Sequence, residues 1–131
     1  MIVTNRRDLL GTARDARGPG WESVRMLVKS DGMGFSMTDT TVLPGAVLTL
    51  QYKNHVEACF CVSGRGKVTV METGESYEIR PGVLYAPNAH DRHEVCVIGA
   101  ESLKLVCTFS PALEGDEVHQ ADGSYAVRWR A

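Results

Sequence analysis

The sequence predicts an all-β protein, built as an antiparallel barrel or jelly roll with one or two short helices. Apolar residues recur mostly at every second position or in short runs broken by glycine, which is typical of strands. Turn residues separate these runs at short intervals, and no helical crossover connects them, which favours antiparallel pairing. With 131 residues, the chain is the size of a single domain that can bury its own core.

The N-terminal part is expected to hold one short helix before the strands begin. Residues 6–16 lack β-branched clusters and Gly/Pro pairs, although Gly11 weakens a helix there. Gly18-Pro19-Gly20 predicts a turn, and Asp31-Gly32-Met33-Gly34 predicts another. The strands expected in this part cover residues 21–29, 35–43 and 47–52.

The second half is expected to contain short strands joined by tight turns. Ser63-Gly64-Arg65-Gly66, Glu72-Thr73-Gly74-Glu75 and Pro81-Gly82 each predict a turn. From residue 111 onward the chain is polar, so we expect residues 111–131 to form a C-terminal tail or lid on one domain of residues 1–131. The strands expected in this half cover residues 57–62, 67–71, 76–79, 83–86, 93–98 and 103–109.

Charge and composition exclude several classes of partner. The net charge of -2 and the absence of a basic run argue against binding to nucleic acid or anionic lipid. The N-terminus has no apolar signal region, and no apolar run is long enough to span a membrane. We therefore expect a soluble, cytoplasmic protein whose partner is a small molecule or a second copy of the chain.

The four cysteines do not have the spacing of a zinc site, and we expect free thiols. Cys59 and Cys61 are two residues apart on a predicted strand, so they share one face with Glu57. We expect Cys59, Cys61 and Cys96 to be small buried core residues, whereas Cys107 also suits a place in a pocket.

One spacing pattern points to the cupin type of barrel. The first cupin motif has the form G-x5-H-x-H-x3,4-E-x6-G, and Gly45, Gln51, Lys53, Glu57 and Gly64 fall in its frame. The two histidine positions are occupied by Gln51 and Lys53, so the usual two-histidine metal site is absent while the glutamate is retained. The spacing therefore supports a cupin-type antiparallel β-barrel more strongly than it supports a metal.

Segments spread over nearly the whole chain match one family of cupins in order. They include Met1-Ile2-Val3, Gly18, Trp21, Asp31-Gly32-Met33-Gly34-Phe35-Ser36, Thr40-Thr41, Tyr52-Lys53-Asn54-His55-Val56-Glu57-Ala58, Pro81-Gly82, Tyr85-Ala86, His90-Asp91-Arg92-His93, Val106-Cys107, Phe109, Glu117-Val118-His119 and Tyr125. In these segments the chain resembles the ectoine synthase family of iron-dependent cupins. The resemblance implies a ferrous ion held by Glu57, Tyr85 and His93, and it implies a homodimer. A carboxylate, a phenol and an imidazole suit iron and leave positions open for substrate.

The reaction implied by the resemblance is the ring closure of N-γ-acetyl-L-2,4-diaminobutyrate to ectoine with loss of water. Iron acts in it as a Lewis acid without redox change. The amine of the substrate is protonated near neutral pH, so a base is required, and Tyr52, Glu117 and His119 are the candidates.

The expected substrate-binding residues combine apolar walls with polar groups. Trp21 and Phe109 would form the walls, and Arg25 could pair with a carboxylate. The complete predicted set is Trp21, Arg25, Thr38, Thr40, Tyr52, Cys107 and Phe109.

Two alternatives remain open from the sequence. Thr38 occupies a position where members of the family tend to carry a longer polar side chain, which leaves room for a related enzyme that acts on a different acylated diamino acid. The other alternative is a non-catalytic cupin that binds a small molecule without iron.

Overall fold

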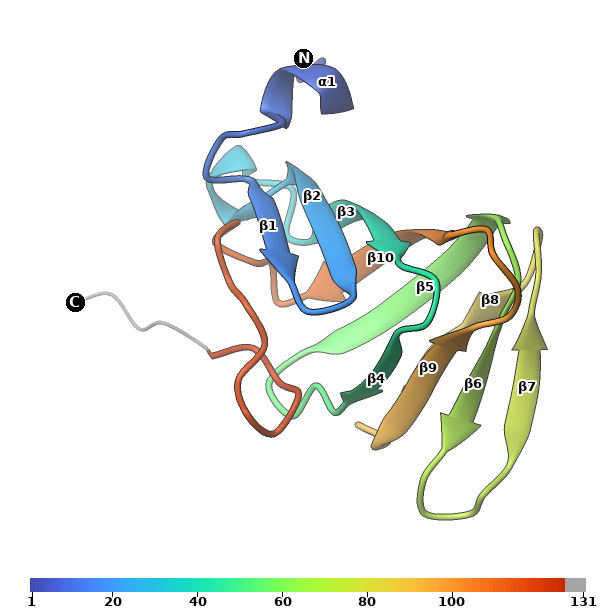
Figure 1. The fold of residues 1–131 in the computed structure, drawn as a ribbon. Helices are drawn as coiled ribbons and strands as arrows, with labels where there is room; N and C mark the ends of the chain where they lie inside the picture. Colours follow the sequence, from blue (N-terminus) through green and yellow to red (C-terminus); the bar gives the residue numbers. More distant parts are fainter. Residues whose placement is uncertain (127–131) are drawn as a thin grey trace.

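The computed structural model describes residues 1–126, and within them the chain forms ten β-strands and two short helices (Figure 1). Residues 127–131, at the end of the predicted tail, lie outside the described residues. In chain order the elements are α1 (Arg6–Leu9), β1 (Asp15–Gly18), β2 (Trp21–Leu27), the 3₁₀-helix η1 (Lys29–Asp31), β3 (Ser36–Val42), β4 (Val47–Leu50), β5 (Val56–Ser63), β6 (Gly66–Val70), β7 (Ser76–Ile79), β8 (Leu84–Tyr85), β9 (His93–Val97) and β10 (Leu103–Ser110).

The predicted N-terminal helix is correct only for its first turn. The Asn5 side chain accepts a hydrogen bond from the Arg7 N–H and caps α1, which ends at Leu9. Gly11 has a φ of 75°, outside the helical region. Residues 15–18 form strand β1 and pair with β2, because the antiparallel ladder gives their backbone groups partners that an isolated short helix could not.

All strand pairs are antiparallel and belong to two sheets. The larger sheet has the order β1-β2-β3-β10-β5-β8, and the smaller has the order β4-β9-β6-β7. In Figure 1 the β1–β2–β3 end of the larger sheet lies on the left, and the smaller sheet lies on the right. The structure therefore confirms the predicted all-β antiparallel architecture.

The two sheets bury one apolar core between them. Val42 and Leu105 come from the larger sheet, and Val68, Ile79 and Val95 come from the smaller one. Strand β5 alternates strictly, with the side chains of Glu57, Cys59 and Cys61 buried on the inner face. The sequence predicted this shared face correctly. All four cysteines are free thiols, and Cys96 is only partly buried.

The tail, from residue 111 to residue 126, folds back onto the barrel near the loop between β4 and β5. The Gln51 N–H donates to the carbonyl of Gly123 over 3.3 Å, and the Asn54 side chain donates to the carbonyl of Tyr125 over 2.9 Å. Figure 1 shows this red segment running down beside β1 and ending near that loop. The described part of the tail therefore covers one end of the barrel.

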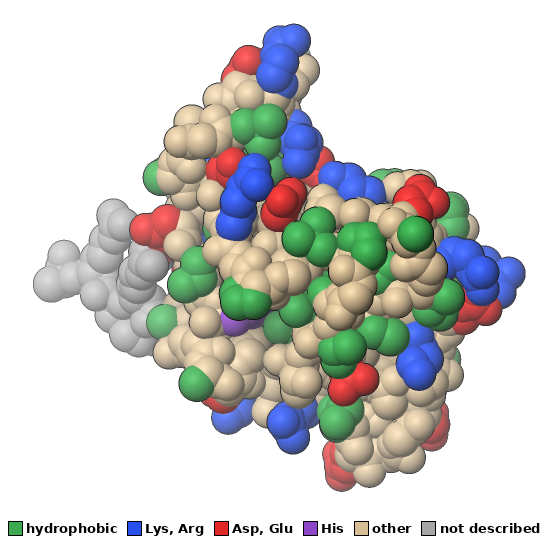
Figure 2. Space-filling view, in the orientation of Figure 1, with side chains coloured by type: hydrophobic (Ala, Val, Ile, Leu, Met, Phe, Trp, Pro, Cys, Tyr) green, Lys and Arg blue, Asp and Glu red, His purple; other side chains and the backbone are tan. Residues whose placement is uncertain are grey.

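Charged side chains of both signs are interspersed over the face drawn in Figure 2. This distribution agrees with the small net charge of -2. Among the described residues, no helix is both long enough and apolar enough to cross a membrane.

Candidate active site

A small cavity lies between the two sheets and the tail, with a volume of about 30 Å³. The cavity brings together most of the residues singled out in the sequence, although they come from five strands and two loops. Those that line it are Trp21, Thr40, Tyr52, Glu57, Tyr85, Cys107, Phe109 and His119.

Glu57 presents a buried carboxyl group to this cavity. It is only 8% exposed, and its buried Oε1 atom has no hydrogen-bond partner among residues 1–126. Burial raises the pKa of Glu57 from 4.5 to about 7, and the hydrogen bond with Cys59 offsets this only in part. A carboxylate buried in this way is costly unless a positive charge compensates it.

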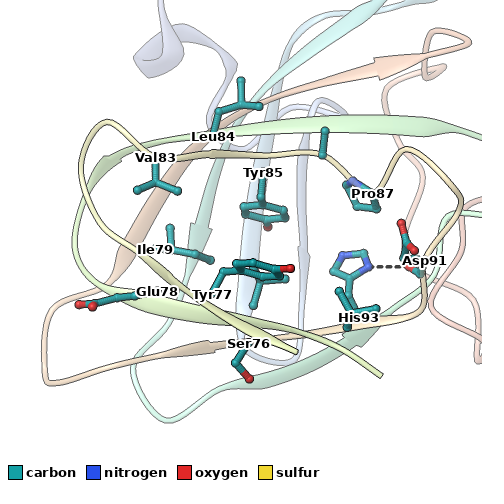
Figure 3. Close-up of a pocket in the computed structure, with 13 residues that line it drawn as sticks. Ser76, Tyr77, Glu78, Ile79, Val83, Leu84, Tyr85, Pro87, Asp91 and His93 are labelled. Carbon is teal, nitrogen blue, oxygen red and sulfur yellow. Dashed lines mark hydrogen bonds between the residues drawn. The ribbon is translucent and has the colours of Figure 1, made fainter. Parts of the chain in front are cut away.

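The His93 side chain is held with one ring nitrogen free. Its Nδ1 lies 2.8 Å from the carbonyl oxygen of Asp91, drawn as a dashed line in Figure 3, so Nδ1 carries the proton and donates it. The Nε2 atom is buried, and no group in the described part of the chain forms a hydrogen bond with it. Burial lowers the pKa of His93, although the carbonyl of Asp91 opposes this. The neutral ring therefore offers a lone pair at Nε2, which is how metal-binding histidines are commonly oriented.

Tyr85 lies between the inner cavity and an outer cleft of about 590 Å³. Figure 3 shows its ring in the outer cleft beside His93, and the two ring centroids are 6.3 Å apart. Burial raises the pKa of Tyr85 well above its usual value, with further contributions from Cys59 and Glu57. Tyr85 is thus a neighbour of His93 and Glu57, the other two predicted metal-binding residues, and of the Cys59 thiol.

The unpartnered atoms of Glu57 and His93 fit the requirements of a bound metal ion. Buried polar atoms normally have hydrogen-bond partners, so these two atoms require an explanation. Glu57 lines the inner cavity and His93 lines only the outer cleft, while Tyr85 borders both. The unpartnered Oε1 of Glu57 and Nε2 of His93 both belong to the predicted metal-binding set. Tyr85 lies near both residues, since its ring packs beside that of His93 and the charge of Glu57 raises its pKa. A cation with oxygen and nitrogen ligands would satisfy these atoms.

A second cluster at the cavity joins Tyr52 to the tail. The Tyr52 hydroxyl and His119 Nε2 lie 2.8 Å apart in a hydrogen bond. The His119 ring stacks on the ring of Tyr125, with centroids 4.6 Å apart and an angle of 11° between the planes. Burial, and then the positive charge of Arg25, lower the pKa of His119 to about 4, so its imidazole is neutral at pH 7. Burial raises the pKa of Tyr52 well above its usual value.

Of the other predicted residues, Glu117 does not line the cavity. Its two carboxylate oxygens accept hydrogen bonds from the N–H groups of Glu114 and Gly115, at 2.7 and 2.8 Å. Its side chain instead borders a separate small pocket that it shares with His55. In this structure Glu117 shapes the tail loop, and its carboxylate is not aimed at the cavity.

Arg25 and Thr38 also lie behind the cavity wall. Arg25 is fully buried, and its guanidinium donates to Ser23 Oγ, to the Gly115 carbonyl and to the Tyr125 hydroxyl, at 3.0, 3.2 and 3.2 Å. Thr38 is 1% exposed and lies 2.9 Å from the hydroxyl of Thr40. Neither side chain lines the cavity, in contrast to the eight predicted residues that do.

Comparison with known proteins identifies the family. The family profile described as ectoine synthase matches residues 1–129. The chain belongs to the ectoine synthase family. It is 48% identical over 127 residues to L-ectoine synthase of Bordetella petrii, an alignment that covers 97% of this chain and 95% of the relative.

Solved structures agree with this assignment. The crystal structure of ectoine synthase from P. lautus superposes with a TM-score of 0.82 at 39% identity, covering 88% of this chain and 81% of that one. The cupin domain of Cnp3 from Schizosaccharomyces pombe has a TM-score of 0.60 at 14% identity, covering 70% and 61% of the two chains. The second likeness shows the fold alone, which is a cupin barrel.

Three residues that lie at or near this site of the ectoine synthase family were not identified from the sequence. Tyr125 closes the cavity from the tail, and Cys59 lines it from β5. His55 is 3% exposed, and its buried Nδ1 has no hydrogen-bond partner in the portion of the chain that the structure describes. The alternation of β5 could have indicated Cys59, because it shares the face of Glu57. No local signal could have indicated Tyr125, since its position depends on how the tail folds back.

Proposed function

We propose that this protein is an ectoine synthase, which closes N-γ-acetyl-L-2,4-diaminobutyrate to ectoine. In this reaction the α-amine nitrogen forms a bond to the acetamide carbon, the carbon–oxygen bond breaks, and the oxygen leaves as water with the two amine hydrogens. The observation that carries the proposal is the Tyr52–His119 pair, whose atoms are 2.8 Å apart in the cavity that Glu57 lines. The chain that holds this pair is 48% identical to a curated L-ectoine synthase.

We propose that a ferrous ion is held by Glu57, Tyr85 and His93. The proposal is supported by the unpartnered Oε1 and Nε2 atoms and by the hydrogen bond that fixes the His93 ring. When bound, the ion would supply Lewis-acid polarisation of the acetamide oxygen. The burial of Glu57 also favours a cation there, because the carboxylate otherwise has no compensating charge.

The Tyr52–His119 pair is suited to handle the proton of the substrate amine. The neutral His119 imidazole can accept a proton, and the hydroxyl of Tyr52 can relay one from a group in the cavity. The positive charge of Arg25 contributes to the low pKa of His119. A substrate carboxylate bound nearby would offset that charge and so raise the proton affinity of the imidazole.

The apolar walls would fold the substrate on itself. Trp21 and Phe109 are 5% and 3% exposed and both line the cavity. Holding the amine and the acetamide carbon of one molecule in contact removes much of the entropic cost of ring closure. The same walls exclude water, which would compete with loss of water from the substrate.

The tail is proposed to act as a lid. The cavity of about 30 Å³ is too small for the substrate, so some part of its wall must move to admit it. His119 and Tyr125 both belong to the tail, and displacement of residues 115–125 would open the cavity and separate His119 from Tyr52. Closure over the substrate would then restore the pair.

An activity assay with purified protein tests the function. Iron-loaded protein incubated with N-γ-acetyl-L-2,4-diaminobutyrate is expected to produce ectoine, detected by proton NMR, and metal-free protein is expected to be nearly inactive. Glu57→Ala and His93→Ala should lose both iron and activity. Glu72→Ala, at an exposed turn, is the matched control and should retain both. Absence of ectoine with the iron-loaded protein would refute the proposal.

Thr38 does not favour a different substrate. It does not line the cavity, and it could act on the substrate only indirectly, through Thr40, whose hydroxyl lies 2.9 Å away, or through its cross-strand partner Cys107. Thr38→Asn is therefore expected to change KM for the acetylated diaminobutyrate by less than about tenfold, a difference of about 1.4 kcal/mol in binding.

We also propose a homodimer in the cytoplasm. The proposal rests on the family resemblance and on the edges of the larger sheet, where β1 and β8 leave backbone groups unpaired by a neighbouring strand. The four free thiols suit a reducing compartment. Sedimentation velocity of the purified protein should give twice the mass of one chain, and a monomer at micromolar concentration would contradict the dimer.

A further inference from the structure

The same cavity contains a second group of possible metal ligands that includes two cysteines. Cys59 on β5 and Cys107 on β10 are direct partners in the antiparallel register, and their sulfur atoms lie 3.4 Å apart. Glu57 precedes Cys59 by two residues on the same face. Ligand atoms of these three side chains all lie within 4.8 Å of one another.

We propose that Glu57, Cys59 and Cys107 form a binding site for a thiophilic divalent cation such as Zn²⁺ or Cd²⁺. The site shares Glu57 with the proposed iron site and differs from it in offering two sulfur ligands. Thiolates bind zinc and cadmium more strongly than ferrous iron, so the two ligand sets select different ions. Because one carboxylate serves both sets, occupation of one excludes the other.

The geometry is already close to that of a bound ion. Two sulfurs bound to one tetrahedral zinc ion lie about 3.8 Å apart, since each Zn–S bond is about 2.3 Å long. The observed separation of 3.4 Å needs a change of less than half an ångström. An ion held by three protein ligands keeps a fourth position open, as catalytic zinc sites do.

Burial of the ligands gives independent support. Cys59, Cys107 and Glu57 are 1%, 2% and 8% exposed, and all three line the inner cavity. Within the described residues, the Oε1 atom of Glu57 has no hydrogen-bond partner. Each thiol must release its proton when it binds the ion, so the two negative sulfurs and the carboxylate outweigh the charge of the ion by one. The full set of ligands can therefore compensate a divalent cation in a low-dielectric site.

Cadmium titration of metal-free, reduced protein tests the site without substrate or iron. We expect one Cd²⁺ per chain with an ultraviolet thiolate-to-cadmium charge-transfer band. Cys59→Ala should lower the affinity at least about 100-fold and remove most of the band, since loss of a ligand should cost at least as much as the about 10–100-fold loss seen for outer-sphere partners. Glu57→Gln should weaken binding while the band remains.

Cys61→Ala is the matched control. Cys61 is buried on the same strand face, but its sulfur lies against the carbonyl oxygens of Ser63 and Gly64, at 3.4 and 3.9 Å. This variant should bind Cd²⁺ as the unmodified protein does. Circular dichroism confirms folding of each variant, and Cys59→Ser replaces Cys59→Ala if the latter does not fold.

The proposal is wrong if the unmodified protein shows no charge-transfer band, or if Cys59→Ala and Cys59→Ser retain it. The inference goes beyond the proposed function and does not depend on it. Failure to bind Cd²⁺ leaves ring closure by the iron-loaded protein untouched, and failure to form ectoine leaves the cadmium site untouched.

Discussion

The buried carboxyl of Glu57 should make the stability of the metal-free protein depend on pH, and Glu57→Gln should abolish this contribution. The folded-state pKa is about 7, whereas the ordinary value is 4.5. Between these two values the folded state binds more protons than the unfolded state. The stabilisation of the folded state is therefore complete below pH 4.5 and is lost as the pH rises through 7.

The expected magnitude follows from the same two values. Each pH unit between the two pKa values corresponds to about 1.36 kcal/mol, so the total loss is about 3.4 kcal/mol. Integrating the linkage relation places about 2.5 kcal/mol of that loss between about pH 5 and about pH 8. Because Glu57 is only 8% exposed, screening by solvent reduces this value little. Glutamine has nearly the same shape and cannot ionise, so the variant should not show the loss.

Urea unfolding of metal-free protein at a series of pH values measures the effect. The free energy of unfolding of Glu57→Gln, minus that of the unmodified protein, should increase by about 2.5 kcal/mol from about pH 5 to about pH 8. Glu72→Gln, in an exposed turn, should show no such trend. A flat difference for Glu57→Gln would mean that the carboxyl group finds a compensating partner, and the argument for a cation at this position would fail.

Four further predictions concern the tail and the cavity wall. The His119 ring, with a pKa of about 4, should show no protonation by NMR above about pH 5, and because this pKa is depressed, its contribution to stability should be lost as the pH falls from 6.5 to 4. Tyr52→Phe should lower kcat about 100-fold, as loss of an acid–base group does, with a change in stability of about 1 kcal/mol. Phe109→Ala should reduce the free energy of unfolding by about 3–5 kcal/mol in urea, because the ring is 3% exposed in the core. Gly123→Ala should loosen the tail by at least about 1–2 kcal/mol, since φ is 83° and a Cβ atom would lie 2.7 Å from the Thr49 carbonyl oxygen; limited proteolysis should then cut the tail faster.

Each of these predictions has a comparison that can contradict it. If the His119 ring titrates near its ordinary pKa, the tail does not bury it in solution. If Tyr52→Phe retains kcat, the hydroxyl has no part in proton transfer. Phe109→Leu should cost much less than Phe109→Ala, because most of the apolar contact is retained. Unchanged proteolysis of Gly123→Ala would show that the tail tolerates the added methyl group.

Much of the fold could be predicted because strand alternation is a local property. Residues 76–79 were predicted and observed as a strand with the same bounds, and the shared inner face of Glu57 and Cys61 followed from their spacing. Residues 10–16 were assigned wrongly to a helix, because residues 15 and 16 pair with β2, and this contact between strands is not contained in local propensity.

The residues of the site could be predicted from the sequence only in part. The resemblance to ectoine synthases indicated which residue types to expect, and eight of the predicted residues line one cavity. Glu117 was predicted as a possible base, but the folded tail directs its carboxylate to two backbone N–H groups. The direction of a side chain on an irregular loop depends on hydrogen bonds that spacing does not encode.

By itself, the sequence determined the all-β class, the face that Glu57, Cys59 and Cys61 share on β5 and the membership of one enzyme family, since these depend on periodicity and residue identity. Only the tertiary structure decided which distant side chains share one cavity. It brought Tyr52 to His119, 67 residues away, and Cys59 to Cys107, 48 residues away. It also set the pKa of Glu57 near 7, because burial depends on every strand that surrounds the carboxyl group.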